Sequence, residues 1–318
     1  MRPFLSVIIP VYNVEDYIEK CARSLFEQTL DNIEYIFVDD CSMDKSIEIL
    51  QQIVKDYPSR EGLVKIVQTP KNSGQYFVRK FGMQFVSGKY LIHCDSDDWI
   101  DSTMYEEMFK IAENGRYDIV CCDFARDFFN EGVRLDSGEI DNLTLIRYLL
   151  IGKIHASLCT KLVRTDVYNN EILYPKSSMR EDMTLVIQLA YYSHKIFYYN
   201  KALYHYFINQ SSISRSTIAE NIINRFWQSK NNAEVIDEFL NRHNIGDYYV
   251  NEMKQLNFVI LMELWPILHT DEGKFLWNSY PIALPFFEVM RIPVPISFKL
   301  KFIIYKLRLL SIIPLNIY

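Results

Sequence analysis

Acidic side chains gather in two short segments of this 318-residue sequence, and their spacing is typical of a metal-binding site. The segment Asp39–Asp44 holds three aspartates, and Asp95–Asp98 holds another three. Carboxylates that lie this close together are costly to ionise unless a cation joins them. Mg²⁺ and Mn²⁺ prefer oxygen ligands and commonly bridge carboxylates to the phosphates of a substrate. Turn formation and helix capping are the alternative roles for Asp39 and Asp44, but the second segment predicts a site for a metal and a diphosphate.

Glycine-rich phosphate loops are excluded as the means of binding that diphosphate. The sequence has only 10 glycines, and no two of them are two or five residues apart. The dinucleotide-binding G-x-G-x-x-G pattern and the P-loop both need such pairs. We therefore expect carboxylates with a metal ion, rather than backbone N–H groups, to bind the phosphates of a nucleotide.

The N-terminal part of the chain alternates strand and helix patterns, which places both acidic segments at one edge of a sheet. Short apolar runs alternate with apolar stripes at helical spacing. Such βα units predict an α/β fold, with a mostly parallel, Rossmann-like sheet flanked by helices. Ligands of these sheets bind beyond the carboxyl ends of the strands, where both acidic segments begin. The predicted strands are Leu5–Ile9, Ile33–Val38, Leu63–Val67, Lys89–Cys94 and Asp118–Phe124, with short aromatic strands at Lys195–Tyr199 and Leu203–Phe207.

The pattern changes near residue 215, after which helices predominate. We therefore expect two domains, 1–215 and 216–318, the second a helical C-terminal extension. The net charge of −6 argues against nucleic-acid binding. Residues 289–318 carry five basic and no acidic side chains, so the remaining residues sum to −11. A basic, apolar tail on an acidic body is typical of contact with a membrane surface.

Six short segments occur in an order and at a spacing that together resemble one family. They are Ser6–Asn13, Val38–Asp44, Asn72–Gly74, Val78–Gly82, Gly88–Tyr90 and Asp95–Asp98. With these segments the chain resembles the family 2 glycosyltransferases of bacterial surface-polysaccharide synthesis, which have the GT-A fold. Two residues depart from the family pattern beside the nucleotide site: Cys41 stands where the family usually has glycine, and Lys80 where it usually has asparagine.

The resemblance implies how the nucleotide is bound. Tyr12 would stack on the base, with Pro10 beside it. Asp40 would accept a hydrogen bond from the base imide, and because an imide N–H suits a carboxylate, a UDP-sugar is the leading donor. Arg79 would lie near the diphosphate.

The acidic segment after the fourth strand completes the implied site. Asp95 and Ser96 would contribute to nucleotide binding, and Asp97 and Asp98 would bind Mn²⁺ or Mg²⁺. The sequence leaves open which of Asp95, Asp97 and Asp98 contacts the ribose and which binds the metal.

Members of the family invert the anomeric carbon in one displacement, which needs a base for the acceptor hydroxyl. Asp182 aligns with the acid pair that has this role, and Glu181 is the alternative. A first-turn acid favoured by the helix dipole is the purely structural interpretation of Asp182. Lys161 either contacts acceptor or phosphate or is a solvated surface lysine. His205 is expected to be packed and hydrogen-bonded rather than a ligand of metal or phosphate.

We therefore expect an inverting, metal-assisted glycosyltransferase of hexosyl or N-acetylhexosaminyl type. Residues 1–100 would bind the nucleotide-sugar donor, and 101–215 a glycan or polyprenyl-linked acceptor. A non-catalytic sugar-nucleotide-binding protein and a sugar nucleotidyltransferase are the alternatives. The six cysteines form no C-x-x-C pair, and residues 4–10 lack the cleavage site of a signal peptide. We expect a cytoplasmic protein, with peripheral attachment to the inner face of the cell membrane through the tail left open.

Overall fold

Two compact units make up the chain. The first comprises Met1–Tyr174 and Leu185–Ile208, and the second comprises Pro175–Thr184 and Asn209–Tyr318. The domain boundary expected at residue 215 lies outside the described residues. The structure is a computed structural model, and it describes residues 2–126, 135–207, 217–280, 289, 291 and 294–306.

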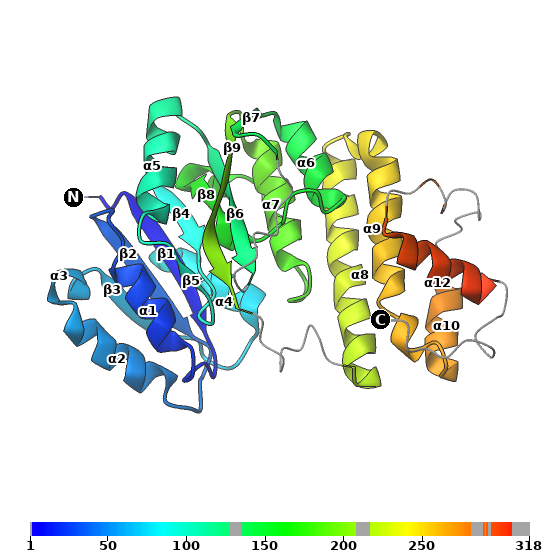
Figure 1. Cartoon of the computed structure of the whole chain (residues 1–318), viewed down its shortest axis with the longest axis horizontal. Helices are drawn as coiled ribbons and strands as arrows, with labels where there is room; N and C mark the ends of the chain where they lie inside the picture. Colours follow the sequence, from blue (N-terminus) through cyan, green and yellow to red (C-terminus); the bar gives the residue numbers. More distant parts are fainter. Residues whose placement is uncertain are drawn as a thin grey trace. The chain divides into compact units, whose positions relative to one another are not determined.

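A nine-stranded sheet forms the centre of the first unit (Figure 1). Its order is β3-β2-β1-β4-β8-β6-β9-β5, and β7 pairs with β9. The first four strands of the chain pair in parallel, as the βα pattern predicts, whereas β8, β5 and β7 pair antiparallel with their neighbours. The strands are β1 (Leu5–Val11), β2 (Ile33–Asp39), β3 (Val64–Gln68), β4 (Tyr90–His93), β5 (Trp99–Ile100), β6 (Ile119–Arg126), β7 (Gly138–Ile140), β8 (Lys161–Arg164) and β9 (Ile196–Tyr206).

β9 is one strand of 11 residues where the sequence predicts two. It runs parallel to β6, and the register between them shifts on either side of Asp123. This irregularity lets β9 continue past the exposed pair Asn200 and Lys201, whose polar side chains interrupt the apolar pattern. The end of β9 thereby reaches β5, with which it pairs antiparallel.

Helices cover both faces of the sheet, as predicted. Val7 and Ile9 of β1 pack in a core cluster with residues of α1 and α5, whereas Ile8 packs with Val78 of α4. Successive side chains of a strand point to opposite faces, so these clusters lie on the two sides. The helices are α1 (Ile18–Phe26), α2 (Ser46–Asp56), α3 (Pro58–Glu61), α4 (Gln75–Gly82), α5 (Met104–Gly115), α6 (Asn142–Leu150) and α7 (Glu181–Tyr192), with 3₁₀ turns η1 (Met83–Phe85), η2 (Leu158–Thr160) and η3 (Thr165–Asn169).

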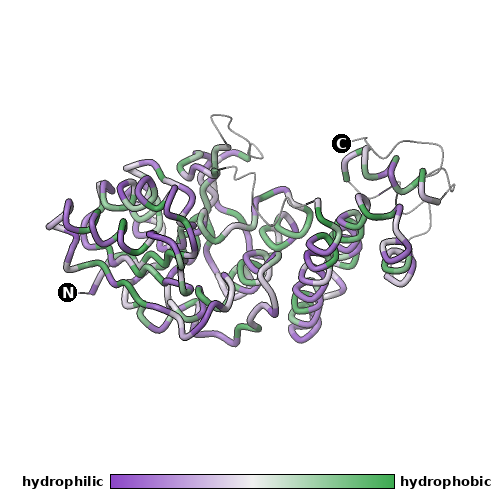
Figure 2. Tube along the Cα trace, turned by 90° about the horizontal axis from the view of Figure 1, so that it is seen from below, coloured by the Kyte–Doolittle hydropathy of each residue, from purple (hydrophilic) through white to green (hydrophobic). Residues whose placement is uncertain are grey.

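The second unit is helical in its described part, which confirms a helical C-terminal region. Hydrophilic and hydrophobic residues are interspersed along its helices (Figure 2), and buried residues such as Phe226, Ile236 and Leu240 follow helical spacing on α8. None of the described helices has an apolar stretch that could cross a bilayer. The elements are α8 (Ala219–Arg242), η5 (Gly246–Tyr249), α9 (Val250–Met262), η6 (Trp265–Ile267), α10 (Asp271–Ser279) and α12 (Ile296–Lys306).

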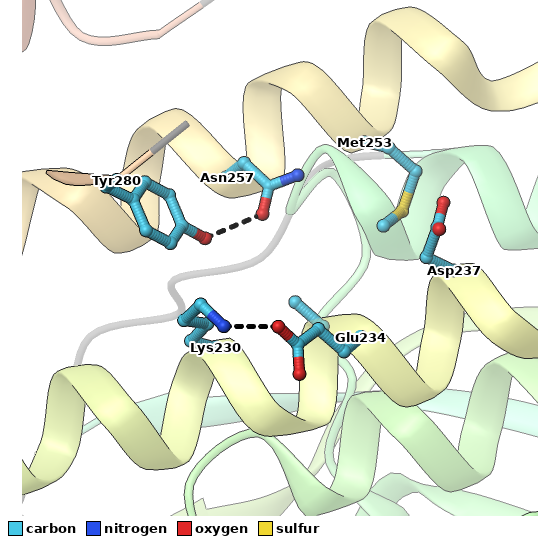
Figure 3. Close-up of a pocket in the computed structure, with 7 residues that line it drawn as sticks. Lys230, Glu234, Asp237, Met253, Asn257 and Tyr280 are labelled. Atoms are coloured by element: carbon cyan, nitrogen blue, oxygen red, sulfur yellow. Dashed lines mark hydrogen bonds and ion pairs between the residues drawn. The ribbon is translucent and has the colours of Figure 1, made fainter. Parts of the chain in front are cut away.

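A pocket of about 190 Å³ opens between α8 and α9 in this unit (Figure 3). Lys230 and Glu234 of α8 form an ion pair within it. The Tyr280 hydroxyl donates to Asn257 Oδ1 at 2.8 Å. Four of its polar residues thus pair with one another, Asp237 accepts from Asn241 outside the lining, and we assign the pocket no ligand.

Candidate active site

The loops that follow β1 and β2 hold each other through side chains. Asn13 Oδ1 accepts a hydrogen bond from Met43 N at 2.9 Å, and Asn13 N donates to Ser42 Oγ at 3.2 Å. Asn13 and Cys41 both have positive φ, at 50° and 64°. The Tyr12 side chain next to this turn is 47% exposed, so its ring is accessible for the stacking that the resemblance implies.

Asp40 is buried and connects the loop after β2 to the turn that begins α4. Its carboxylate accepts hydrogen bonds from Thr69 Oγ1 at 2.8 Å and from Gly74 N at 2.9 Å. The Ser73 N–H lies 3.0 Å from each of the two carboxylate oxygens. Three donors thus make four contacts with the carboxylate, two on each oxygen. Pro10, the other residue expected near the base, is the next-to-last residue of β1.

Arg79 connects α4 to the segment Asp95–Asp98, which we call the acid loop. Its side chain is only 2% exposed, and Nη2 lies 2.7 Å from Asp95 Oδ1. Gln75, one turn earlier on the same helix, donates from Nε2 to the same oxygen at 2.9 Å. Two donors from α4 thus orient the Asp95 carboxylate, and one of them neutralises its charge.

Asp97 lies partly buried in the acid loop, next to the buried Ser96. Burial, and next the negative charge of Asp95, raise the pKa of Asp97 to about 6. Among the described residues, no other residue donates a hydrogen bond to the Asp97 carboxylate. A carboxylate in such a place lacks the positive partner that a bound cation would provide.

Asp98 is 1% exposed, and both of its oxygens have donors. The Tyr204 hydroxyl donates to Oδ2, and the Phe207 N–H donates to Oδ1 at 2.8 Å. Burial, followed by repulsion from Asp95 and Asp97, raises the pKa of Asp98 well above its usual value. Of the two predicted metal ligands, Asp98 therefore accepts hydrogen bonds from Tyr204 and Phe207, whereas Asp97 accepts none from either residue.

The acid loop fits a divalent cation whose coordination is completed by a substrate. In the described part of the chain, no three His, Cys, Asp or Glu side chains cluster as a full set of protein ligands. Mg²⁺ is usually held by one or two carboxylates together with substrate phosphates and water. Asp97 and Asp95 provide such a pair of carboxylates.

The segment that precedes the predicted base is held by α8 within the second unit. Asn232, fully buried on α8, donates from Nδ2 to Ser177 O at 2.7 Å and to Met179 O at 2.6 Å. Its Oδ1 accepts from Lys176 N at 2.9 Å. One amide side chain thus satisfies three backbone groups of this segment.

Glu181 and Asp182 form the first turn of α7. Arg180 just before them has a left-handed φ of 60°, and its Nη2 lies 2.8 Å from Glu263 Oε1 at the C-terminal end of α9. Glu181 is buried, and Asp182 is partly buried. Both acids belong to the second unit, so their role towards the acid loop stays a prediction.

Comparison with known sequences identifies the family of this chain. The profile of glycosyl transferase family 2 matches residues 6–172, more than half of the chain. The chain belongs to glycosyl transferase family 2. EpsH of Bacillus subtilis (strain 168) is 31% identical over 66% of this chain and 62% of its own length. The chain thus spans less than two thirds of that relative.

Solved structures confirm the GT-A fold. Residues 1–349 of S. aureus TarS, in complex with UDP-GlcNAc, superpose with a TM-score of 0.58 at 22% identity, covering 83% of this chain and 81% of that one. The mannosyltransferase PcManGT from Pyrobaculum calidifontis, in complex with GDP-Man and Mn²⁺, also gives 0.58 at 12% identity, covering 98% of this chain and 89% of that one.

Lys161 in this family 2 member has neither of the roles that the sequence suggests. It is 1% exposed, so it is not a solvated surface lysine. Its Nζ donates to His155 O at 2.8 Å, to Ser157 O at 3.3 Å and to Thr160 Oγ1 at 2.6 Å. An ammonium group has three donors, and all three bind the residues just before β8, so none is left for a phosphate or an acceptor.

His205 is packed and hydrogen-bonded, as predicted. Its ring stacks on Trp99 with centroids 5.4 Å apart and an interplanar angle of 1°. Nε2 lies 2.8 Å from Asp101 Oδ1. The Lys20 ammonium lies 2.9 Å from the Trp99 ring centroid.

No sequence pattern predicted a role for Gln75 or Asn232, and Tyr204 and Phe207 were predicted only as part of the aromatic strand Leu203–Phe207. Tyr204 binds through its side-chain hydroxyl. The others bind through a backbone N–H or an amide, for which the residue type gives no indication. Their partners lie far away in the sequence and become evident only when the sheet is formed.

Proposed function

We propose that the chain is an inverting glycosyltransferase that moves a hexosyl or N-acetylhexosaminyl group from a UDP-sugar to a glycan or polyprenyl-linked acceptor in polysaccharide biosynthesis. Family membership supports the reaction class. The observation that carries the proposal is the acid loop, where α4 orients Asp95 and where Asp97 has no donor from another residue in the described chain. Mn²⁺ or Mg²⁺ held by Asp97 and Asp95 would neutralise the departing diphosphate.

Tyr12 and Asp40 would bind the uridine. The exposed Tyr12 ring offers a surface on which the base can stack. Asp40, whose carboxylate is held by Thr69, Ser73 and Gly74, would accept the imide N–H of uracil. The UDP-GlcNAc complex of TarS, which has the same fold, supports this choice of nucleotide.

Asp182 would act as the base in a single displacement. The acceptor oxygen forms a bond to the anomeric carbon as the bond from that carbon to the diphosphate oxygen breaks, and the electron pair leaves with UDP. The hydroxyl proton passes to the Asp182 carboxylate. Attack from the face opposite the leaving group inverts the anomeric centre.

A donor screen tests the reaction. The full chain is incubated with individual UDP- and GDP-sugars and MnCl₂, and released nucleotide and free sugar are measured by mass spectrometry. Release of UDP from one UDP-sugar, abolished by EDTA, is the expected result. Pyrophosphate formation from a nucleoside triphosphate would indicate a nucleotidyltransferase instead. UDP binding without any turnover, and without dependence on metal, would indicate a non-catalytic binding protein.

Asp182→Asn tests the base, with Glu181→Gln as the matched neighbour. Loss of a positioned general base typically lowers the rate by about 10²–10⁴-fold. We expect that loss in transfer to acceptor for Asp182→Asn, with the UDP affinity of the wild-type protein. Full transfer by Asp182→Asn, with the loss in Glu181→Gln, would move the base to Glu181.

We also propose a cytoplasmic place with a peripheral contact between the C-terminal region and an anionic membrane surface. Residues 289–318 hold five basic and no acidic side chains. On α12, Ile296 and Leu300 are 76% and 53% exposed and lie one helical turn apart. Exposed apolar side chains among lysines suit the interface of a bilayer, where a polyprenyl-linked acceptor would lie.

A further inference from the structure

The end of β9 lies alongside the acid loop. The loop joins β4 to β5, and β5 pairs antiparallel with β9 in the register Trp99 to His205 and Ile100 to Tyr204. The conformation of the acid loop is therefore tied to a strand that comes about a hundred residues later in the chain.

One hydroxyl contacts both ends of the acid loop. Tyr204 is 2% exposed. Its Oη donates to Asp98 Oδ2 and accepts from Asp95 N at 3.2 Å. The Phe207 N–H binds the other oxygen of Asp98. Two groups of β9 and its end thus satisfy the buried Asp98 carboxylate, and one of them also holds the backbone where the loop begins.

Neighbouring side chains fix where Tyr204 and Phe207 lie. His205, which follows Tyr204, stacks on Trp99 and binds Asp101, so it ties β9 to β5. The Phe207 ring lies 5.1 Å from that of Tyr17, the residue just before α1. The Tyr204 hydroxyl is therefore positioned by packing on both sides of it along the chain.

We propose that Tyr204 is a positioning residue for the donor site: by anchoring Asp98, its hydroxyl holds the acid loop in the conformation that presents Asp95 and Asp97 to the metal and diphosphate. Asp98 is then an anchor rather than a ligand. This inference rests on the proposed function. Without the hydroxyl, the buried Asp98 keeps only the Phe207 donor, and Asp95 N loses its acceptor, which favours rearrangement of the loop.

Tyr204→Phe tests this proposal, and Tyr198→Phe is its matched control. Tyr198 is also on β9 and 2% exposed, and its hydroxyl donates to Asp123 Oδ1 at 2.6 Å. Tyr204→Phe loses the hydrogen bond to Asp98 and the one from Asp95 N, and Tyr198→Phe loses the part-buried bond to Asp123, so the thermal stability of both variants is measured alongside. UDP is titrated calorimetrically into the full chain at a series of MnCl₂ concentrations. The readout is the Mn²⁺ concentration that gives half of the maximal increase in UDP affinity. It should rise about tenfold in Tyr204→Phe and stay unchanged in Tyr198→Phe, because loss of a hydrogen bond that orients metal ligands weakens metal binding by about that factor.

The outcomes separate this inference from the function on which it rests. An equal Mn²⁺ requirement in Tyr204→Phe and Tyr198→Phe overturns the positioning role and leaves the function standing. A wild-type protein whose UDP affinity does not respond to Mn²⁺ overturns the metal-assisted function, and this inference with it.

A second pair of variants tests the anchor without touching Tyr204. Asn at position 98 can still accept from Phe207 N and can pair its amide with Tyr204 Oη, so Asp98→Asn should keep the Mn²⁺ requirement within about threefold of wild type. Asp97→Asn removes a proposed ligand and should raise it by about 100-fold or more. Equal losses in the two variants would make Asp98 a ligand and overturn the proposal.

Discussion

At the scale of single residues, Cys41 has a backbone conformation that favours glycine. Its φ of 64° lies in the left-handed region, which costs an L-residue about 1–2 kcal/mol. The family usually has glycine at this position, and the strained φ explains that preference physically.

Cys41→Gly should therefore stabilise the protein. Relief of the left-handed conformation outweighs the extra unfolded-state entropy of glycine, for a net gain of about 0.5–1 kcal/mol in the free energy of unfolding by urea. The Cys41 thiol donates weakly to Thr69 O at 3.4 Å, and its loss slightly reduces the gain. The same exchange at Cys121, buried in β6, should destabilise. Destabilisation by Cys41→Gly would show that the thiol contact outweighs the strain.

Composition and motif order placed the acidic residues after the correct strands, but they did not separate the roles of adjacent acids. Asp97 and Asp98 differ because β9 supplies Tyr204 and Phe207 to one of them only. The structural role of Lys161 was not predicted for a related reason: no sequence pattern shows which backbone carbonyls will accept hydrogen bonds from a buried ammonium group.

At the scale of elements, Glu107 connects α5 to β9. Its carboxylate accepts from Tyr199 Oη and from Lys201 Nζ, each at 2.7 Å. Thr103 Oγ1 donates to it as well, at 2.7 Å. These bonds fasten the middle of β9 to the helix that covers it, beside the polar residues that interrupt its apolar pattern.

Glu107 should make stability depend on acid pH. Burial raises its pKa, but the hydrogen bonds from Lys201, Thr103 and Tyr199 outweigh this and lower the pKa to about 2, from 4.5. Because the folded-state value is lowered, the stabilisation is complete above pH about 5 and is lost as pH falls towards 2. Glu107→Gln should cost about 1–2 kcal/mol at pH 7, discounted for the 25% exposure of the side chain.

Urea unfolding at several pH values checks the Glu107 prediction. The difference between wild type and Glu107→Gln should shrink as pH falls below about 4. Glu48→Gln, at an exposed position on α2, should match wild type throughout. A constant difference at all pH values would mean that Glu107 contributes through packing rather than charge.

Long apolar elements were predictable, and short or irregular ones were not. β2 is a continuous buried run of seven residues, and β1 is buried throughout except at Pro10, so the sequence reveals both directly. β5 has two residues, too few for any pattern, and exists because β9 lies beside it. The polar interruption of β9 looked like the end of a strand, but its extra residues bulge out of the pairing with β6, which advances only from Cys122 to Asp123 while β9 advances from Tyr199 to Ala202.

At the scale of the whole molecule, the repeated βα units were enough to predict the fold class. They did not predict that the residues around Asp182 group with the helical unit. That grouping depends on Asn232, a buried polar residue in the middle of α8 that binds three backbone groups of residues 176–179. An asparagine inside an amphipathic helix gives no indication in the sequence of what it binds.

Charge is also unevenly distributed over the whole chain, since residues 289–318 hold five basic and no acidic side chains on a protein of net charge −6. The full chain should therefore co-sediment with phosphatidylglycerol vesicles, not with phosphatidylcholine vesicles, and about 0.5 M NaCl should release it. Replacing both Ile296 and Leu300 by Glu should lower the bound fraction several-fold, because it places acids on the exposed apolar face of α12. Phe275→Glu on α10, also at an exposed site (68%), should bind as wild type does. Equal binding by all three proteins would assign the membrane contact to another surface, and sedimentation with neither vesicle would contradict the contact itself.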